Sequence, residues 1–202
     1  EDLPAELGTR AYHGGMVLPR HASLDPGRYH AGLLGVARRA GARIVSRCPV
    51  ERLERASGGF RLMTPRGEVR AQRVVLATNG YSGALFPKLR ASLVPAGSFQ
   101  VATAPLPDAL LQQILPGRCV VSDTRRVGNY FRIGPENRLM MGGRGTFSDT
   151  PADAAYARLI GNLHRTYPET RGLPIAYRWT GRVAMTADHL PHVHQPLPGL
   201  TM

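Results

Sequence analysis

The sequence places three histidines and an aspartate close together near its C-terminal end. Asp188, His189, His192 and His194 form an Asp-His-x-x-His-x-His run, and imidazole and carboxylate groups are common ligands of transition metals. The surrounding chain is rich in proline and lacks regular periodicity, so it does not hold the directions of these side chains. No other histidine or cysteine stands at a pairing distance that supports a site, and we predict that the run binds no metal.

Other common catalytic signatures are missing from the sequence. There is no Gly-x-Ser-x-Gly elbow for a nucleophilic serine. Neither a Gly-x-x-x-x-Gly-Lys-Ser/Thr loop nor a Gly-x-Gly-x-x-Gly turn after a strand is present. Residues 142–145 (GGRG) follow a predicted strand, but no helix opens directly behind them, so we interpret them as a backbone crossing point and not as a pyrophosphate site.

Length and composition restrict the class of protein. With 202 residues, 43% hydrophobic and 20% charged, the chain is large and apolar enough to fold. No apolar run reaches the roughly 18 residues needed to cross a bilayer, and residues 1–4 lack the blocks of a secretory signal. Cys48 and Cys119 have no CxxC spacing, which favours reduced thiols. We therefore expect a cytoplasmic protein with no membrane partner.

The formal net charge of +12 raises the question of a nucleic-acid partner. Thirteen arginines and four acidic residues lie between positions 10 and 73, so the excess is regional. These arginines are scattered, with no run longer than two and no interleaved aromatic ladder for stacking bases. We predict no nucleic-acid partner, although a basic nucleic-acid-binding domain and a non-catalytic interaction module stay open as alternatives.

The first part of the chain predicts a helix followed by short strands. Asp25 is a good N-cap and Pro26 suits the first helical position, and the apolar periodicity continues to Gly41. Glycine-rich turns then predict an antiparallel meander, and residues 73–77 (RVVLA) predict a strand covered on both faces. The expected strands span residues 42–45, 50–53, 60–64, 68–71 and 73–77.

Beyond Gly83, irregularly spaced prolines and alternating strands indicate a second domain. One long helix is expected, with Thr150 as cap, Pro151 at its first turn and its end before Pro168. The expected strands span residues 93–103, 119–122, 129–133, 138–142 and 175–185. The predicted fold class is α+β: part of an α/β domain with an inserted antiparallel meander, plus a β-rich domain with a mixed or antiparallel sheet and one long helix.

Eight short segments along the chain resemble one family when taken in order. They are residues 14–15 (GG), 24–33 (LDPGRYHAGL), 49–53 (PVERL), 74–81 (VVLATNGY), 102–106 (ATAPL), 130–132 (YFR), 138–144 (RLMMGGR) and 177–181 (YRWTG). This series resembles the D-amino-acid-oxidase-type FAD oxidoreductases, and within them the γ-glutamylputrescine oxidase branch. The resemblance implies FAD as cofactor, a small-molecule amine as substrate, hydride transfer to give an imine, and dioxygen as the oxidant.

The same resemblance implies a division of the chain and a set of cofactor contacts. Residues 1–83 match part of the FAD-binding domain, 84–178 the substrate-binding domain and 179–202 a return to the FAD-binding domain. The backbone of Val50 matches the position that meets adenine. The implied cofactor-binding residues are Val50, Ala77, Thr78, Asn79, Trp179, Thr180 and Gly181. A turn at the carboxyl end of a buried strand presents free N–H and C=O groups, which suits this assignment.

The predicted substrate pocket contains Tyr130, Arg132 and Trp179. Tyr130 and Arg132 alternate on one strand and therefore share a face, where an aromatic ring and a cation suit an amine that carries a distant carboxylate. Solvent-exposed edge residues are the alternative interpretation. No side chain is predicted as the catalytic group, because the flavin carries the chemistry in the family.

Two departures from the family pattern inform the expected activity. Gly181 is followed by Arg182 and Val183, where amino-acid oxidases often have an arginine that clamps the α-carboxylate. Val183 lacks that guanidinium, so we expect an amine; a D-amino-acid or glycine/sarcosine-type enzyme is the alternative. The Gly-x-Gly-x-x-Gly turn of the family would precede residue 1, so we interpret the chain as an internal fragment that does not retain FAD and is inactive alone.

Overall fold

The computed structural model describes residues 2–125, 128–145, 147 and 152–202. The chain divides into two compact units. The sheet unit comprises residues 1–22 and 95–183, and the meander unit comprises residues 23–94 and 184–202. The first 22 residues belong to the sheet unit, whereas the division implied by the family resemblance groups them with residues 23–83. The assignment of the parts to cofactor and substrate stays a prediction.

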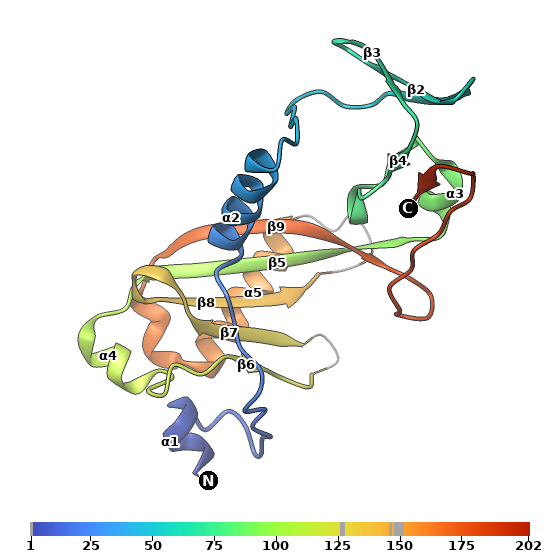
Figure 1. Ribbon diagram of the computed structural model, residues 1–202. Helices are drawn as coiled ribbons and strands as arrows, with labels where there is room; N and C mark the ends of the chain where they lie inside the picture. Colours follow the sequence, from blue (N-terminus) through green and yellow to red (C-terminus); the bar gives the residue numbers. More distant parts are fainter. Residues whose placement is uncertain (1, 126–127, 146, 148–151) are drawn as a thin grey trace. The chain divides into compact units, whose positions relative to one another are not determined.

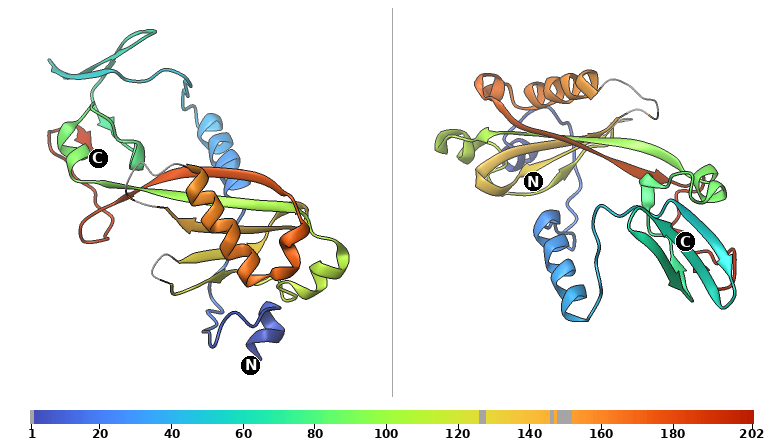
Figure 2. Two further views of the ribbon diagram at one scale, coloured as in Figure 1. Left: turned by 180° about the vertical axis from the view of Figure 1, so that it is seen from behind. Right: turned by 90° about the horizontal axis from the view of Figure 1, so that it is seen from above.

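The sheet unit is built on a five-stranded sheet (Figure 1). Its strands lie in the order β6 (Val121–Ser122), β7 (Asn129–Ile133), β8 (Arg138–Arg144), β5 (Val94–Pro105) and β9 (Ile175–Met185). Strand β7 pairs antiparallel with both β6 and β8, and β8 pairs antiparallel with β5. Helix α5 (Ala152–Thr166) lies across one face of this sheet (Figure 2).

The core of the sheet unit forms between α5 and that face. Leu159 and Leu163 of α5 are buried, as are Phe131 of β7 and Met141 of β8. Because side chains alternate between the faces of a strand, burial of Phe131 directs its neighbours Tyr130 and Arg132 to the second face, the face opposite α5. The two faces of this sheet therefore have different environments.

Short helices complete the sheet unit. They are α1 (Leu3–Leu7), α4 (Asp108–Gln113), and the 3₁₀ turns η2 (Pro135–Asn137) and η3 (Pro168–Gly172). The Tyr167 hydroxyl donates a 2.8 Å hydrogen bond to the carbonyl oxygen of Leu7. Leu7 and Tyr167 are both buried, so this bond joins α1 to the chain just after α5.

The meander unit contains two small sheets and three helical segments. Strands β1 (Arg52–Ala56), β2 (Gly59–Thr64) and β3 (Gly67–Ala71) form the antiparallel meander. Strands β4 (Val74–Val75) and β10 (Leu200–Thr201) form a parallel pair. The helical segments are α2 (Pro26–Arg39), η1 (Asn79–Tyr81) and α3 (Pro87–Ala91). Phe60, Val74 and Leu200 form its small buried core.

The structure confirms the α+β class and several elements in detail. The Asp25 carboxylate accepts hydrogen bonds from the backbone N–H groups of Gly27 and Arg28, so it caps α2 as expected. The antiparallel meander, the antiparallel pairing in the larger sheet and the long helix α5 are also present. The proposed helix start at Thr150 and Pro151 lies outside the described residues. Among the described helices, none combines the length and apolar character required to cross a bilayer.

Two predicted strands differ from the structure. Residues 42–45 form no strand, and Ile44 and Val45 are 45% and 59% exposed. The strand expected over residues 73–77 is reduced to β4, in which Val74 is buried while Val75 is 70% exposed, so coverage on both faces was wrong. Both segments are apolar enough to be buried strands, but among the described residues β4 pairs only with β10 and residues 42–45 have no pairing strand.

Candidate functional site

A strand-end turn in the meander unit contains three of the predicted cofactor residues. Strand β4 pairs in parallel with β10, and the backbone N–H of Leu76 still donates to the carbonyl of Thr201. Pairing then stops, and Ala77 and Thr78 are exposed. Within the described part of the chain, no group accepts a hydrogen bond from either of their backbone N–H groups. The turn therefore offers free donors at the carboxyl end of a parallel strand.

Asn79 organises this turn. Its backbone is left-handed, with φ of 48°, a conformation that asparagine tolerates better than most residues. Its side-chain oxygen Oδ1 accepts hydrogen bonds from the backbone N–H groups of Gly80, at 2.6 Å, and Ala184, at 3.0 Å. Ala184 belongs to the meander unit like the turn itself, so Asn79 joins the turn to the start of residues 184–202.

Hydroxyl groups close the same turn. The hydroxyl oxygens of Thr78 and Ser82 lie 2.7 Å apart, and Ser82 also donates to the carbonyl oxygen of Asn79 at 2.8 Å.

Val50, the other predicted cofactor residue of this unit, is half-buried just before β1. Among the contacts of the described residues, none joins Val50 to the turn.

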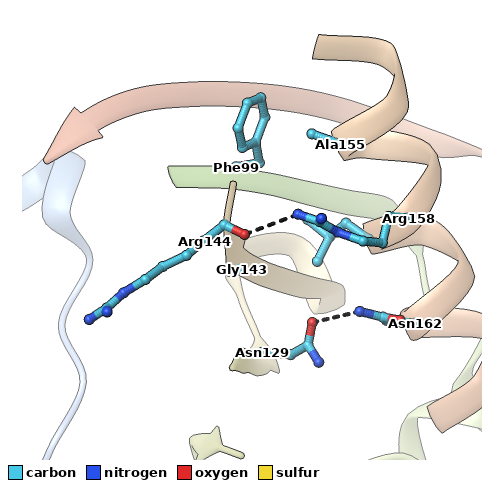
Figure 3. A pocket seen from close by; sticks show the side chains of 8 residues that line it. Phe99, Asn129, Gly143, Arg144, Ala155, Arg158 and Asn162 are labelled. Carbon is cyan, nitrogen blue, oxygen red and sulfur yellow. Dashed lines mark hydrogen bonds between the residues drawn. The ribbon is translucent and has the colours of Figure 1, made fainter. Parts of the chain in front are cut away.

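The second face of the five-stranded sheet holds the predicted substrate residues. Tyr130 and Arg132 lie on this face of β7 and are half-buried. On β8, Arg144 also points away from α5, as Figure 3 shows. The Arg138 guanidinium stacks over the ring of Tyr177, 5.0 Å from its centroid. Arg138 and Arg144 are an even number of residues apart on β8, so both side chains lie on the second face. Tyr177, which Arg138 contacts, therefore lies on this face as well.

Trp179 shares this face. It stands two residues after Tyr177 on β9 and is 39% exposed. The intervening Arg178 lies over the ring of Tyr156 on α5, which places Arg178 on the opposite face. The structure thus places Tyr130, Arg132 and Trp179 on one side of one sheet.

A chain of hydrogen bonds connects two of the predicted residues through a residue that the sequence did not single out. The Tyr130 hydroxyl lies 2.7 Å from the hydroxyl of Ser98 on β5, and Thr180 donates to the Ser98 carbonyl oxygen at 2.9 Å. Strand β8 lies between β7 and β5, and its residue opposite Tyr130 is Gly142. A Cβ at Gly142 would overlap the Tyr130 ring, so glycine lets the ring extend across β8 towards Ser98.

Two hollows in the described structure lie away from these residues. A cavity of about 70 Å³ lies between β8 and α5, where Arg158 donates to the carbonyl oxygen of Arg144 and Asn162 donates to Oδ1 of Asn129 (Figure 3). It opens on the α5 side of the sheet and contains none of the predicted site residues. A second hollow lies at the meander, is lined by Phe60 and Gln72 among others, and contains none of them either.

The histidine run near the C-terminal end forms a small polar cluster. The Asp188 carboxylate lies 3.0 Å from Nε2 of His192, and the rings of His192 and His194 stack with centroids 5.2 Å apart. The hydrogen bond from His192, followed by that from the Leu190 backbone N–H, lowers the pKa of Asp188 to about 2. Across the described residues no group of three ligating side chains is arranged to hold a metal ion.

Comparison with known proteins decides the family. A model of the family described as FAD dependent oxidoreductase (DAO) matches residues 1–202. The chain belongs to this family. Membership implies FAD as the cofactor of this DAO-family protein.

Curated relatives extend well beyond the matched region. The chain is 31% identical to a probable oxidoreductase OrdL of Rhizobium meliloti, over 100% of this chain and 46% of the relative. It is 26% identical to γ-glutamylputrescine oxidoreductase of Escherichia coli, over 92% of this chain and 44% of the relative. The chain therefore spans about half the length of the relatives it matches.

Solved structures share the fold. A glycine oxidase from Geobacillus kaustophilus matches with a TM-score of 0.66 at 24% identity, over 85% of this chain and 46% of that one. An iminodiacetate oxidase from Chelativorans sp. BNC1 matches with a TM-score of 0.68 at 17% identity, over 87% of this chain and 48% of that one. At these identities the likeness shows that the fold is shared. It does not identify a substrate.

The residues of this chain fit part of an FAD molecule. The free backbone donors of Ala77 and Thr78 stand at the carboxyl end of a parallel strand, a position suited to a nucleotide cofactor. The exposed ring of Trp179 offers a flat apolar surface. The glycine-rich turn and helix N-terminus that hold a pyrophosphate in such folds are not in this sequence.

Proposed function

We propose that this chain is part of a DAO-family enzyme that oxidises the C–N bond of an amine to an imine. FAD, when bound, accepts the hydride and passes the electrons to dioxygen. In this proposal Val50, Ala77, Thr78, Asn79, Trp179, Thr180 and Gly181 contact the cofactor. The substrate is a small amine of the γ-glutamylputrescine type, and the matched half alone is inactive.

The placement of Tyr130, Arg132 and Trp179 on one face of the sheet is the observation that supports this proposal most. An aromatic ring packs against the methylene groups of an aliphatic amine and shields its reacting carbon from water. The guanidinium of Arg132 suits a carboxylate at the far end of such a substrate. The bond between Tyr130 and Ser98 holds the phenol ring in place while the substrate binds.

The proposal also assigns the parts of the chain. Residues 1–83 and 179–202 contribute to the FAD-binding domain, and residues 84–178 form the substrate-binding domain. The location is the cytoplasm, as the two cysteines without CxxC spacing suggested. The relative named γ-glutamylputrescine oxidoreductase supports an amine as the substrate.

An amino acid is the competing substrate class. A relative named D-amino acid dehydrogenase, from Cereibacter sphaeroides, is 31% identical over 98% of this chain and 46% of its own length. Val183 argues against it, because a branched aliphatic side chain forms no bidentate pair with an α-carboxylate.

An anaerobic absorbance titration of the complete FAD-loaded enzyme tests the proposal. We expect an amine such as γ-glutamylputrescine to bleach the flavin band faster than D-alanine or glycine at equal concentration. Faster reduction by D-alanine or glycine would instead support the amino-acid class. An absence of any flavin band in the complete protein would contradict both classes.

A further inference from the structure

The small cavity between β8 and α5 is not used by the proposed function. It lies on the α5 side of the sheet, away from the face that carries Tyr130, and its apolar walls are Phe99, Ala155 and Leu159. Ala155 and Leu159 are buried, at 5% and 4% exposed. A volume of about 70 Å³ corresponds to about two water molecules. The cavity therefore has room for a small ion and not for a nucleotide or a sugar.

The polar side chains that α5 contributes to the cavity are hydrogen-bond donors (Figure 3). The Arg158 guanidinium donates to the carbonyl oxygen of Arg144 at 3.2 Å. Nδ2 of Asn162 donates to Oδ1 of Asn129 at 2.9 Å. Among the described residues, neither donor side chain has a second acceptor, although a guanidinium and an amide nitrogen each carry further N–H groups. Donor capacity thus remains at the cavity.

Two neighbours fix the direction of the Asn162 amide. Its Oδ1 accepts a hydrogen bond from Arg165, and its Nδ2 meets Oδ1 of Asn129. Asn129 is 3% exposed, and its own Nδ2 donates to the Asp123 carboxylate at 3.0 Å. A flipped Asn162 amide would place oxygen against oxygen at Asn129, so the nitrogen is the atom that faces this residue and the cavity.

The charge of the cavity is positive. Its lining includes no acidic side chain, and in the described ranges the Arg158 guanidinium has no carboxylate within ion-pair distance. The Asp123 carboxylate, which Asn129 contacts, is paired with Arg125 at 3.5 Å. Arg158 is exposed, which provides a path of entry from solvent. The apolar walls lower the local dielectric constant and strengthen the attraction of this guanidinium for an anion.

We propose that the cavity binds one small monovalent anion, a halide or a short carboxylate such as formate, through the Arg158 guanidinium and the Asn162 amide. A single negative charge balances the single guanidinium, and the volume excludes larger anions. Because both donors belong to α5 while the groups they already contact belong to β8 and β7, the bound anion links the helix more firmly to the sheet. The proposal depends neither on the flavin nor on the identity of the amine.

Anomalous scattering from bromide tests the site in crystals of the complete FAD-loaded protein. Bromide is a monovalent anion, and its anomalous signal distinguishes it from water. After a soak in sodium bromide we expect a peak in contact with both the Arg158 guanidinium and Nδ2 of Asn162. Water alone at this position, or an acidic side chain of the complete protein seated on Arg158, would overturn the proposal.

Chloride binding in solution separates a site from an adventitious ion only. The broadening of the chloride NMR line on addition of the complete protein gives the Kd. We expect Arg158→Gln to weaken binding at least about tenfold, the usual effect of losing a charged hydrogen-bond donor. Arg90→Gln removes the same charge at an exposed position in the meander unit and should leave the Kd unchanged. Equal losses in the two variants would identify an adventitious ion only and would contradict the proposal.

Competition on the wild-type protein gives an answer even if Arg158→Gln does not fold. Formate fits the cavity and should displace chloride, whereas gluconate carries the same charge on a molecule too large to enter. We expect formate to narrow the chloride line to its width without protein, and gluconate at equal concentration to leave it broad. Equal displacement by both anions would show that chloride binds at an open surface and would overturn the proposal.

Discussion

The Tyr130 hydroxyl and the Ser98 hydroxyl lie 2.7 Å apart although a complete strand separates β7 from β5. The Tyr130 ring spans that strand at Gly142, where the absence of a Cβ leaves room for it. Thr180 reaches the same residue from β9. Hydrogen bonds at Ser98 thus join β7, β5 and β9, and the Tyr130 ring crosses β8 to make them.

Gly142→Ala should break this arrangement. The added methyl group overlaps the Tyr130 ring, so the ring must move and its bond to Ser98 is lost. We expect the free energy of unfolding to fall by about 1–3 kcal/mol, as for other overpacked sites, measured by urea denaturation. Gly172→Ala is the control, because a Cβ there meets no atom within 4 Å. A similar loss for both variants would mean that the Tyr130 ring does not depend on Gly142.

The coupling of Tyr130 and Ser98 can be measured directly. Tyr130→Phe, Ser98→Ala and the double variant form a cycle that isolates the hydroxyl–hydroxyl bond. The expected coupling is about 0.5–1.5 kcal/mol in the free energy of unfolding, the usual net value of a hydrogen bond. Strictly additive effects would show that the two hydroxyl groups do not interact in solution.

Tyr167 should stabilise the fold only while it is protonated. Burial raises the pKa of its phenol above the usual value of 10, so its contribution is complete below pH 10 and is lost as the pH rises towards the folded pKa. Tyr167→Phe leaves a buried carbonyl of Leu7 without this donor and should cost about 1–3 kcal/mol at neutral pH. The variant should also lose less stability than the wild type above pH 10. Tyr177→Phe, at an exposed position, is the control in urea denaturation at both pH values.

The pair of Asp188 and His192 predicts a titration at low pH. The hydrogen bond from His192 holds the pKa of Asp188 at about 2, below its usual 3.8, so the contribution of Asp188 is present above pH 3.8 and is lost as the pH falls through about 2. His192→Ala should return that pKa towards 3.8, as observed by NMR of the carboxyl carbon. His21→Ala, at an exposed position, should not. An unchanged pKa in His192→Ala would show that the pair does not form in solution.

Asn79 should be required for both the backbone conformation and the bond to Ala184. Asn79→Gly keeps the left-handed backbone but removes Oδ1, whereas Asn79→Ala loses both. We expect faster hydrogen exchange of the Ala184 amide in both variants. The free energy of unfolding should be lower by about 1 kcal/mol in Asn79→Ala than in Asn79→Gly. Unchanged exchange at Ala184 in both would show that Oδ1 does not accept a hydrogen bond from this amide in solution.

Elements with local signals were predicted well from the sequence. The cap at Asp25, the glycine turns of the meander and the alternation in residues 129–133 each depend on residues close in the chain. The buried strands expected at 42–45 and 73–77 were not, because an apolar run becomes a strand only where a neighbour pairs with it. For Val74 that neighbour is Leu200, far along the chain.

In the candidate site, too, some features follow from local sequence and others from contacts between distant residues. Period-two alternation was sufficient to place Tyr130 and Arg132 on one face, and the order of eight short motifs was sufficient to indicate the family that the comparison confirmed. Ser98 and Gly142 could not be connected to Tyr130 in this way, because cross-strand register is set by packing between distant residues. Local spacing therefore determined the chemistry available to this protein, and only the tertiary structure decided which of those residues meet.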